Sequence, residues 1–253
     1  MLKAIWAARW YVLLGFLVFI VTLAATTPLH FVWKYAEPYS RSLPVNIQRV
    51  SGTLWHGQAQ LQAPQIGALE LDWQLSPLAL LAAQADLQLQ VRGNGLDLQT
   101  NAVLTASQQL TLTNTRGSVS SALLEPMLRR GRASLAGEFE INALAARIQL
   151  AEKRIDELDG QIIFSGGDVG FPVDGKPIQA QLPLLVGQLQ NEQDKSLVNI
   201  ETQEGLPIGQ AFLQQDGWGG VAIRRRFLDI LGQRWPAEAT EETVIFEVSQ
   251  KIL

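Results

Sequence analysis

Few side chains in this sequence could make or break covalent bonds. Among the 253 residues there is no cysteine and there are only two histidines, which excludes disulfides, thiolate nucleophiles and zinc–thiolate sites. A Ser-His-Asp mechanism needs an imidazole, and His56 is the histidine that lies away from the apolar N-terminus. His56 falls on the polar side of an alternating segment, so we expect an ordinary exposed residue. The sequence therefore predicts no catalytic residue, no metal site and no enzymatic activity.

Carboxylates are the remaining side chains that could act as general acids and bases. Glu138 and Glu140 would share one face of a strand, and Asp156, Glu157 and Asp159 form a second group. Glycosidases use two carboxyl groups that flank the scissile bond. Clusters of this kind are also common on solvated surfaces, and that is how we interpret both groups. A hydrolase that uses these carboxylates stays as an alternative hypothesis.

Gly93-Asn94-Gly95 has the beginning of a dinucleotide-binding fingerprint. The third glycine of that fingerprint is missing, and a strand-like alternation follows where a helix is required. We therefore predict a hairpin turn at this position. The sequence has no Gly-Lys-Ser/Thr phosphate loop, and its net charge of −4 gives no basic footprint for nucleic acid. Neither a cofactor nor a nucleic-acid partner is expected.

Two arginine clusters are candidate contact sites. Their members are Arg129, Arg130 and Arg132 in the first cluster and Arg224, Arg225 and Arg226 in the second. Guanidinium groups bind carboxylates and phosphates well, so each cluster could contact a partner protein or anionic lipid. The alternatives are charge at a helix C-terminus for the first cluster and a solvated turn for the second.

The elements that position these side chains are predicted to be strands. Small or apolar residues alternate with polar ones in residues 55–61, 69–75 and 87–91. This period is typical of antiparallel strands that turn one face to a core and the other to water. Glycines at the centre of an apolar-x-Gly-x-apolar pattern, at 52, 137 and 160, indicate bends or bulges. We predict a mainly β fold, with an elongated, curved, mostly antiparallel sheet.

Short helices and turns punctuate the predicted strands. Helices are expected at residues 77–84, 122–130 and 225–231. Asn94-Gly95 and Asp216-Gly217 are typical of hairpin turns. A polar break near residues 131–134 suggests a possible subdivision of the sheet-rich part.

The N-terminal region predicts a single membrane-spanning helix. Residues 10–29 carry no charge, and at about 1.5 Å per residue they match a hydrocarbon core of roughly 30 Å. Lys3 and Arg9 precede this run, so the N-terminus should be cytoplasmic. A cleaved signal peptide is the alternative.

The predicted anchor divides the chain into four segments. These are a cytoplasmic segment 1–9, a transmembrane anchor 10–30, a juxtamembrane linker 31–44 and a β-rich domain 45–253 outside the cytoplasm.

One set of residues resembles a known family. Its members are Gly52, Thr53, Leu54, Trp55, Gly57, Trp73 and Pro77. The Gly-Thr-Leu-Trp-x-Gly segment, the later Leu-x-Trp strand and the Pro-Leu-x-x-Leu helix resemble the type II secretion system protein N family. Trp55 and Trp73 should lie on the apolar side of successive strands, where they could pack as a cross-strand pair. We expect these motif residues to specify the fold.

The resemblance implies an accessory scaffold component of the Gram-negative apparatus that exports folded proteins from the periplasm across the outer membrane. It also implies anchoring in the inner membrane, a periplasmic sheet domain, other type II secretion subunits as partners, and no catalytic residues. The sheet is more loosely similar to AsmA-like proteins. That similarity implies an alternative function in lipid handling or envelope integrity, with lipid as the ligand.

Overall fold

The computed structural model describes residues 45–64, 66–129, 132–173, 176–192, 195–232 and 240–251, together with Phe16. The predicted cytoplasmic segment 1–9, anchor 10–30 and linker 31–44 lie, apart from Phe16, outside the described residues. Within the described ranges, no helix is long and apolar enough to span a membrane.

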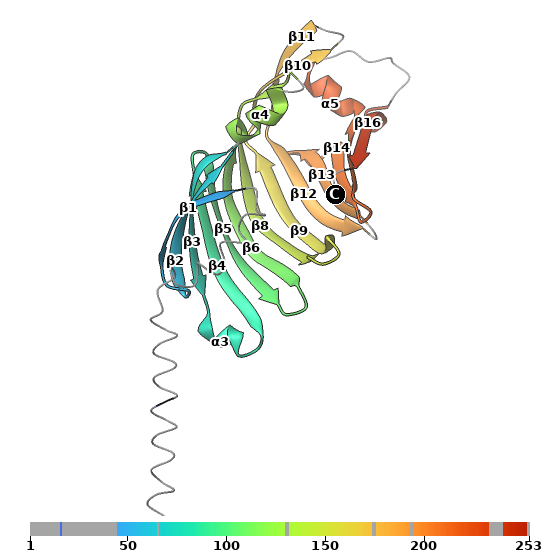
Figure 1. Cartoon of the computed structure of the whole chain (residues 1–253). Helices are drawn as coiled ribbons and strands as arrows, with labels where there is room; N and C mark the ends of the chain where they lie inside the picture. Colours follow the sequence, from blue (N-terminus) through green and yellow to red (C-terminus); the bar gives the residue numbers. More distant parts are fainter. Residues whose placement is uncertain are drawn as a thin grey trace, which may run out of the picture.

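Antiparallel strands make up most of the described chain, which confirms the prediction of a mainly β fold (Figure 1). The main sheet has 13 strands in the order β1-β2-β3-β4-β5-β6-β8-β9-β12-β13-β14-β15-β16. Its strands are β1 (Asn46–Gly52), β2 (His56–Ala63), β3 (Gly67–Leu75), β4 (Gln84–Gly93), β5 (Leu96–Thr105), β6 (Gln109–Ser120), β8 (Glu138–Gln149), β9 (Arg154–Phe164), β12 (Leu185–Glu192), β13 (Lys195–Thr202), β14 (Pro207–Gln214), β15 (Trp218–Arg224) and β16 (Val244–Lys251). A second, three-stranded sheet has the order β11-β10-β7 and consists of β7 (Ser134–Leu135), β10 (Gly167–Val173) and β11 (Lys176–Leu182).

The period-two alternation places apolar side chains on one face of the main sheet. Leu71 of β3, Val91 of β4 and Leu98 of β5 lie directly opposite one another in the two ladders. Residues that oppose each other in an antiparallel pair share a face. Leu75 on this face is buried, whereas its neighbour Gln74 is exposed. We call the face that carries these apolar side chains the inner face, and the opposite one the outer face.

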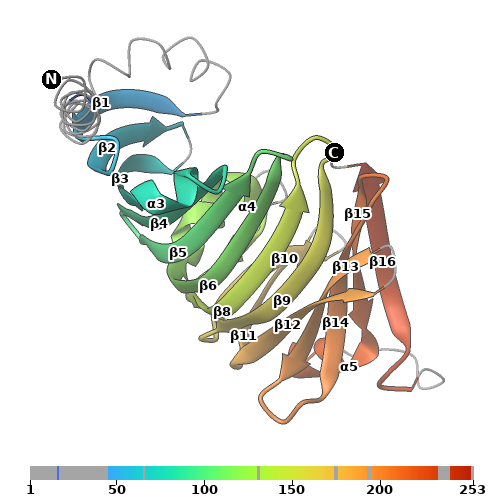
Figure 2. The same ribbon diagram turned by 90° about the horizontal axis from the view of Figure 1, so that it is seen from below.

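The main sheet is curved, as Figure 2 shows, and its ladders contain bulges. Gly160 lies where the register of β8 and β9 shifts; its φ is +136°, and a Cβ there would lie 2.6 Å from the Cα of Leu144. Gly117 in β6 has a φ of +144°, and a Cβ there would lie 1.9 Å from the carbonyl oxygen of Asp97. Glycine is needed at both positions because bulges of this kind bring two backbones too close for any side chain.

The short helices differ in length from those predicted. Helix α3 (Pro77–Leu80) ends earlier than the predicted 77–84, because Ala83 adopts a positive φ of 55° and β4 begins directly after it. The predicted helix 122–130 is a 3-10 helix η1 (Ser121–Leu124) followed by α4 (Glu125–Leu128). Helix α5 (Arg225–Ile230) agrees with the predicted 225–231.

The segment around the suggested subdivision at 131–134 leaves the main sheet and returns to it. Along the chain, η1, α4 and β7 lie between β6 and β8, while β6 and β8 pair directly with each other. The ladder therefore continues across this point. The subdivision itself stays a prediction.

One end of the inner face is covered by other elements. Helices α4 and α5 and the hairpin of β10 and β11 gather at this end, inside the bend of the main sheet (Figures 1 and 2). Contacts of the β10–β11 hairpin and of the α5 region with the main sheet form a buried apolar cluster of Phe164, Leu182, Leu185, Ile208 and Leu231. Farther along the sheet, inner-face side chains such as those of Leu89 and Leu98 are partly exposed. This packed cluster therefore lies at one end of the sheet, while single buried residues such as Leu75 and Ala102 lie elsewhere on it.

Substitution at the Gly117 bulge tests whether the close approach of two backbones there contributes to the stability of the sheet. We expect Gly117→Ala to lower the free energy of unfolding by about 3 kcal/mol or more, because the new methyl group would meet the Asp97 carbonyl and the backbone would keep a positive φ. Gly205→Ala is the matched control: its φ is +79°, with nothing within 4 Å of a new Cβ. That control should lose only about 1 kcal/mol. Urea unfolding of the full chain in detergent measures both, and equal losses would show that close backbone approach is unimportant.

Candidate functional site

The family-like motif builds the first hairpin of the main sheet. Trp73 in β3 lies directly opposite Gly57 in β2, and a Cβ at position 57 would lie only 2.0 Å from Cζ2 of the indole. The indole Nε1–H donates a hydrogen bond of 3.1 Å to the carbonyl oxygen of Leu54. Trp73 therefore covers the start of β2 and holds the segment before it in place.

Trp55 and Trp73 lie on neighbouring segments, and their packing as a cross-strand pair stays a prediction. Trp55 precedes β2, and its carbonyl accepts a 2.7 Å hydrogen bond from the N–H of Leu75, two residues beyond Trp73. The residue that faces Trp73 is Gly57, because a bulky side chain there would collide with the indole.

The remaining motif residues shape tight turns. Gly52 has a φ of +93°, and a Cβ there would lie 2.5 Å from the His56 carbonyl oxygen. Thr53 donates its N–H to the same oxygen at 2.8 Å, and its Oγ1 accepts from the N–H of His56 at 3.2 Å. Pro77 stands at the start of α3, where its missing N–H costs nothing. A purely structural role for the motif stays a prediction.

The carboxylate groups lie among arginines or on the exposed surface. Asp156 accepts a 2.6 Å hydrogen bond from Nε of Arg154, which also pairs with Glu152. The bond to Asp156, together with the charges of Asp156 and Glu152, raises the pKa of Arg154 above its ordinary value. The carboxylates Glu138 and Glu140 are exposed on β8. Within the described ranges, no group of three or more His, Cys, Asp or Glu side chains is placed to hold a metal ion.

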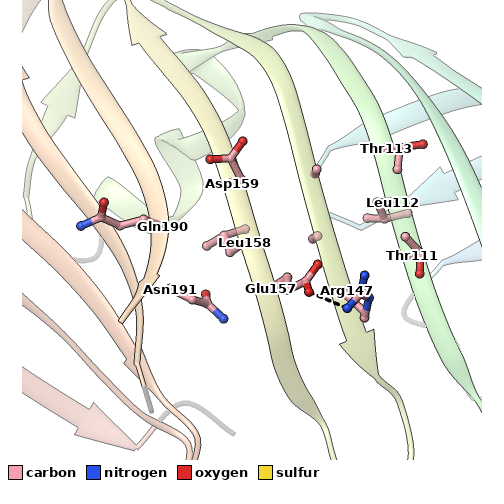
Figure 3. A pocket seen from close by; sticks show the side chains of 11 residues that line it. Thr111, Leu112, Thr113, Arg147, Glu157, Leu158, Asp159, Gln190 and Asn191 are labelled. Carbon is pink, nitrogen blue, oxygen red and sulfur yellow. Dashed lines mark hydrogen bonds and ion pairs between the residues drawn. The ribbon is translucent and has the colours of Figure 1, made fainter. Parts of the chain in front are cut away.

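A cavity of about 490 Å³ lies across β6, β8, β9 and β12 (Figure 3). It forms where β9 and β12 diverge: their ladder covers Gly160–Phe164, and beyond it Nδ2 of Asn191 donates to the Asp156 carbonyl at 2.8 Å. Figure 3 shows Arg147 and Glu157 joined across neighbouring strands, with 2.5 Å between Nη1 and Oε1. Threonine, glutamine and carboxylate side chains also line the cavity, together with Leu112, Leu158, Ala145 and Ala146, so it combines hydrogen-bonding and apolar groups.

A second cavity, of about 290 Å³, is lined entirely by apolar residues. It lies on the inner face between the main sheet and Leu135 of β7. The rings of Phe139 and Phe164 form part of its wall, with centroids 5.0 Å apart. Leu182 of β11 closes another side. Such a cavity can hold an aliphatic group of a ligand or partner. Sequence analysis missed it because its walls come from strands far apart in the chain.

The second arginine cluster ties the chain after α5 to the main sheet. Arg226 donates to Oε2 of Glu241 at 3.0 Å and to the carbonyl of Pro207 at 3.0 Å, and its side chain is only 13% exposed. Arg224 donates to the carbonyl of Glu242 at 3.3 Å. Arg225 lies 3.8 Å from Asp229 along α5. Contact of this cluster with a partner or lipid stays a prediction, and Arg226 already makes intramolecular bonds.

The first arginine cluster is more exposed. Arg129 pairs with Glu125 one helical turn earlier at 2.6 Å, and its side chain is 73% exposed. Arg132 is exposed on the turn that follows α4, whereas Arg130 lies outside the described residues. Arg129 and Arg132 therefore present accessible positive charge beside the covered end of the sheet. Their contact with a partner or lipid also stays a prediction.

Comparison with protein families gives one match. The model of the family "Type II secretion system (T2SS), protein N" matches residues 44–227. This span contains the motif, both arginine clusters and both cavities. No curated protein and no solved structure matches the chain.

The contact between Gly57 and Trp73 can be tested by a double-mutant cycle. Gly57→Ala should destabilise the full chain by about 1–3 kcal/mol, because the methyl group collides with the indole. Trp73→Ala should cost about 3–5 kcal/mol. The double variant should be destabilised by less than the sum, since removal of the indole makes room for the new methyl group at position 57. Urea unfolding gives the three values; strict additivity would contradict the direct contact.

The role of Arg226 can be separated from that of an exposed arginine. Arg226→Ala should lower the free energy of unfolding by about 1.5–3 kcal/mol, because it removes charge-assisted hydrogen bonds from a mostly buried group. Arg129→Ala is the matched control and should change stability by less than about 0.5 kcal/mol. Chemical denaturation measures the stability of both variants. If Arg226→Ala leaves the free energy of unfolding unchanged, the hydrogen bonds of Arg226 do not hold the chain after α5.

Proposed function

The chain belongs to the type II secretion system protein N family, and from this membership we propose that it is a non-enzymatic scaffold subunit of that apparatus. The observation that carries the proposal is the family match, which covers residues 44–227. In this role the protein supports the export of folded proteins from the periplasm across the outer membrane of a Gram-negative cell. Its partners are other secretion subunits.

We place the subunit in the inner membrane, with its sheets in the periplasm. The uncharged length of residues 10–29 supports a single-pass anchor, and Lys3 and Arg9 before it support a cytoplasmic N-terminus. On this arrangement the linker 31–44 joins the anchor to β1. The first hairpin would then lie nearest the membrane.

A binding role suits the chemistry of the surface better than catalysis does. The sequence holds no cysteine and only two histidines, and the carboxylates Asp156 and Glu157 pair with arginines. By contrast, Arg129 and Arg132 offer exposed cations at the covered end of the sheet, where an acidic surface of another subunit could bind. We propose this end as the surface that contacts the apparatus.

A second candidate function is lipid handling in the envelope. One observation favours it: the apolar cavity of about 290 Å³ on the inner face, whose lining includes Phe139, Phe164 and Leu185. A cavity lined only by apolar groups favours a hydrocarbon chain over a polar ligand. The two candidates differ in what they bind, so one experiment can separate them.

In-cell crosslinking tests the proposed function. Because native cysteines are absent, a single Arg129→Cys substitution places one reactive thiol at the proposed contact surface. Lys153→Cys is the control: it is exposed in the turn between β8 and β9, away from α4 (Figure 1). We expect Arg129→Cys to crosslink to another secretion subunit, Lys153→Cys not to, and deletion of the protein to reduce export of folded substrates.

The opposite pattern would replace the scaffold proposal. If neither cysteine crosslinks to a secretion subunit, while a photoactivatable acyl lipid labels residues around Phe139, lipid handling is the better description. Intact export in the deletion strain would likewise count against a role in secretion.

A further inference from the structure

The last strand of the main sheet has an open edge. In the part of the chain that the structure describes, β16 forms one ladder, with β15, running from Trp218 opposite Lys251 to Arg224 opposite Val244. β16 ends the sheet order, so among the described strands its other edge has no partner for its N–H and C=O groups. Edge strands commonly avoid pairing by prolines, by charges or by being short. β16 has eight residues and no proline.

Apolar side chains line this edge. Phe246 and Val248 are 54% and 50% exposed, and Val221 beside them on β15 is 42% exposed. All three lie on the inner face, since Phe246 opposes Ile223 and Val248 opposes Val221. From Glu247 to Lys251 the outer face of β16 is polar, with Glu247, Ser249 and Lys251. The strand therefore exposes apolar side chains beside its free edge, which a partner strand would help to cover.

We propose that β16 pairs antiparallel with β16 of a second copy of this chain. In an antiparallel pair, opposite residues point to the same face of the sheet. A twofold axis perpendicular to the sheet, placed between the two β16 strands, therefore keeps the inner faces of both copies on the same side of the joined sheet. A register centred on Ser249 puts Glu247 opposite the partner's Lys251. The symmetry repeats this pair, which gives two ion pairs on the outer face. On the inner face Val248 becomes a diagonal neighbour of the partner's Val248.

Charge selects this register over its neighbours. A register centred on Glu247 sets two like carboxylates opposite each other, which is unfavourable. One centred on Val248 sets Glu247 opposite the partner's Ser249 and Lys251 opposite the partner's Ile245, so neither charge has a counter-ion. Glu247 and Lys251 each lie two residues from Ser249, so a twofold axis at Ser249 brings each of them opposite the other in the partner.

Crosslinking in native membranes tests the pairing. Ser249→Cys in the full chain should give covalent dimers with a short bismaleimide, because the two thiols face each other across the axis. Ser51→Cys is the matched control, an exposed serine on β1 at the other edge of the same sheet. We expect about tenfold more dimer from Ser249→Cys than from Ser51→Cys. Equal yields, or a crosslink only to a different protein, would overturn self-pairing.

A charge swap tests the register and distinguishes a lost ion pair from a misfolded variant. Glu247→Lys and Lys251→Glu should each weaken dimerisation of the detergent-solubilised chain by roughly tenfold in sedimentation experiments, since each puts like charges opposite one another twice. The double variant Glu247→Lys/Lys251→Glu should restore wild-type dimerisation, which shows that the single variants fold. Failure of the double variant to recover, or a wild-type chain that stays monomeric at every concentration, would refute the proposal.

Discussion

The hydrogen-bonded ladders between neighbouring antiparallel strands are the interaction on which the rest of the described structure depends. The buried apolar cluster lies at one end of the main sheet, around Phe164 and Ile208, while inner-face side chains such as Leu89 are partly exposed elsewhere. A packed cluster therefore secures one end, while along the rest of the sheet single buried residues such as Leu75 and Ala102 supplement the pairing between strands. Continuous ladders require that neighbouring backbones approach closely at every bulge. This requirement explains the glycines at 117 and 160, where a Cβ would overlap the adjacent strand.

Most of the fold could be predicted from local sequence patterns, because strand alternation and turn-forming residues act over only a few positions. The alternation in residues 69–75 and 87–91 identified β3 and β4, and Asn94-Gly95 identified the hairpin that follows β4. Helix α3 was predicted too long, since the positive φ of Ala83 ends the segment in a way that its apolar neighbours do not signal. Local sequence reasoning is weakest where the backbone conformation of one residue decides a boundary.

The site features required contacts between distant segments, which sequence patterns do not encode. The motif placed Trp55 and Trp73 on successive strands but did not indicate which residue lies opposite Trp73; register places Gly57 there, and register depends on the whole first hairpin. Arg226 and Glu241 are 15 residues apart, and their pairing follows from the position of α5 against β14. The apolar cavity needs walls from both sheets. The family resemblance, in contrast, rested on order and spacing within a short stretch, and the match over residues 44–227 confirms it.

The strand order has a consequence for how the chain acquires its structure. From β1 to β6 each strand pairs with the next one in sequence, and the same holds from β12 to β16. Such short-range pairing lowers the entropic cost of closing loops and favours fast, sequential zippering of the sheet. The exceptions are the joins of β6 to β8 and of β9 to β12, where β7 and the β10–β11 hairpin leave the main sheet to form the second one. During synthesis from the N-terminus, the chain can thus complete β1 to β6 as a six-stranded sheet before these joins form.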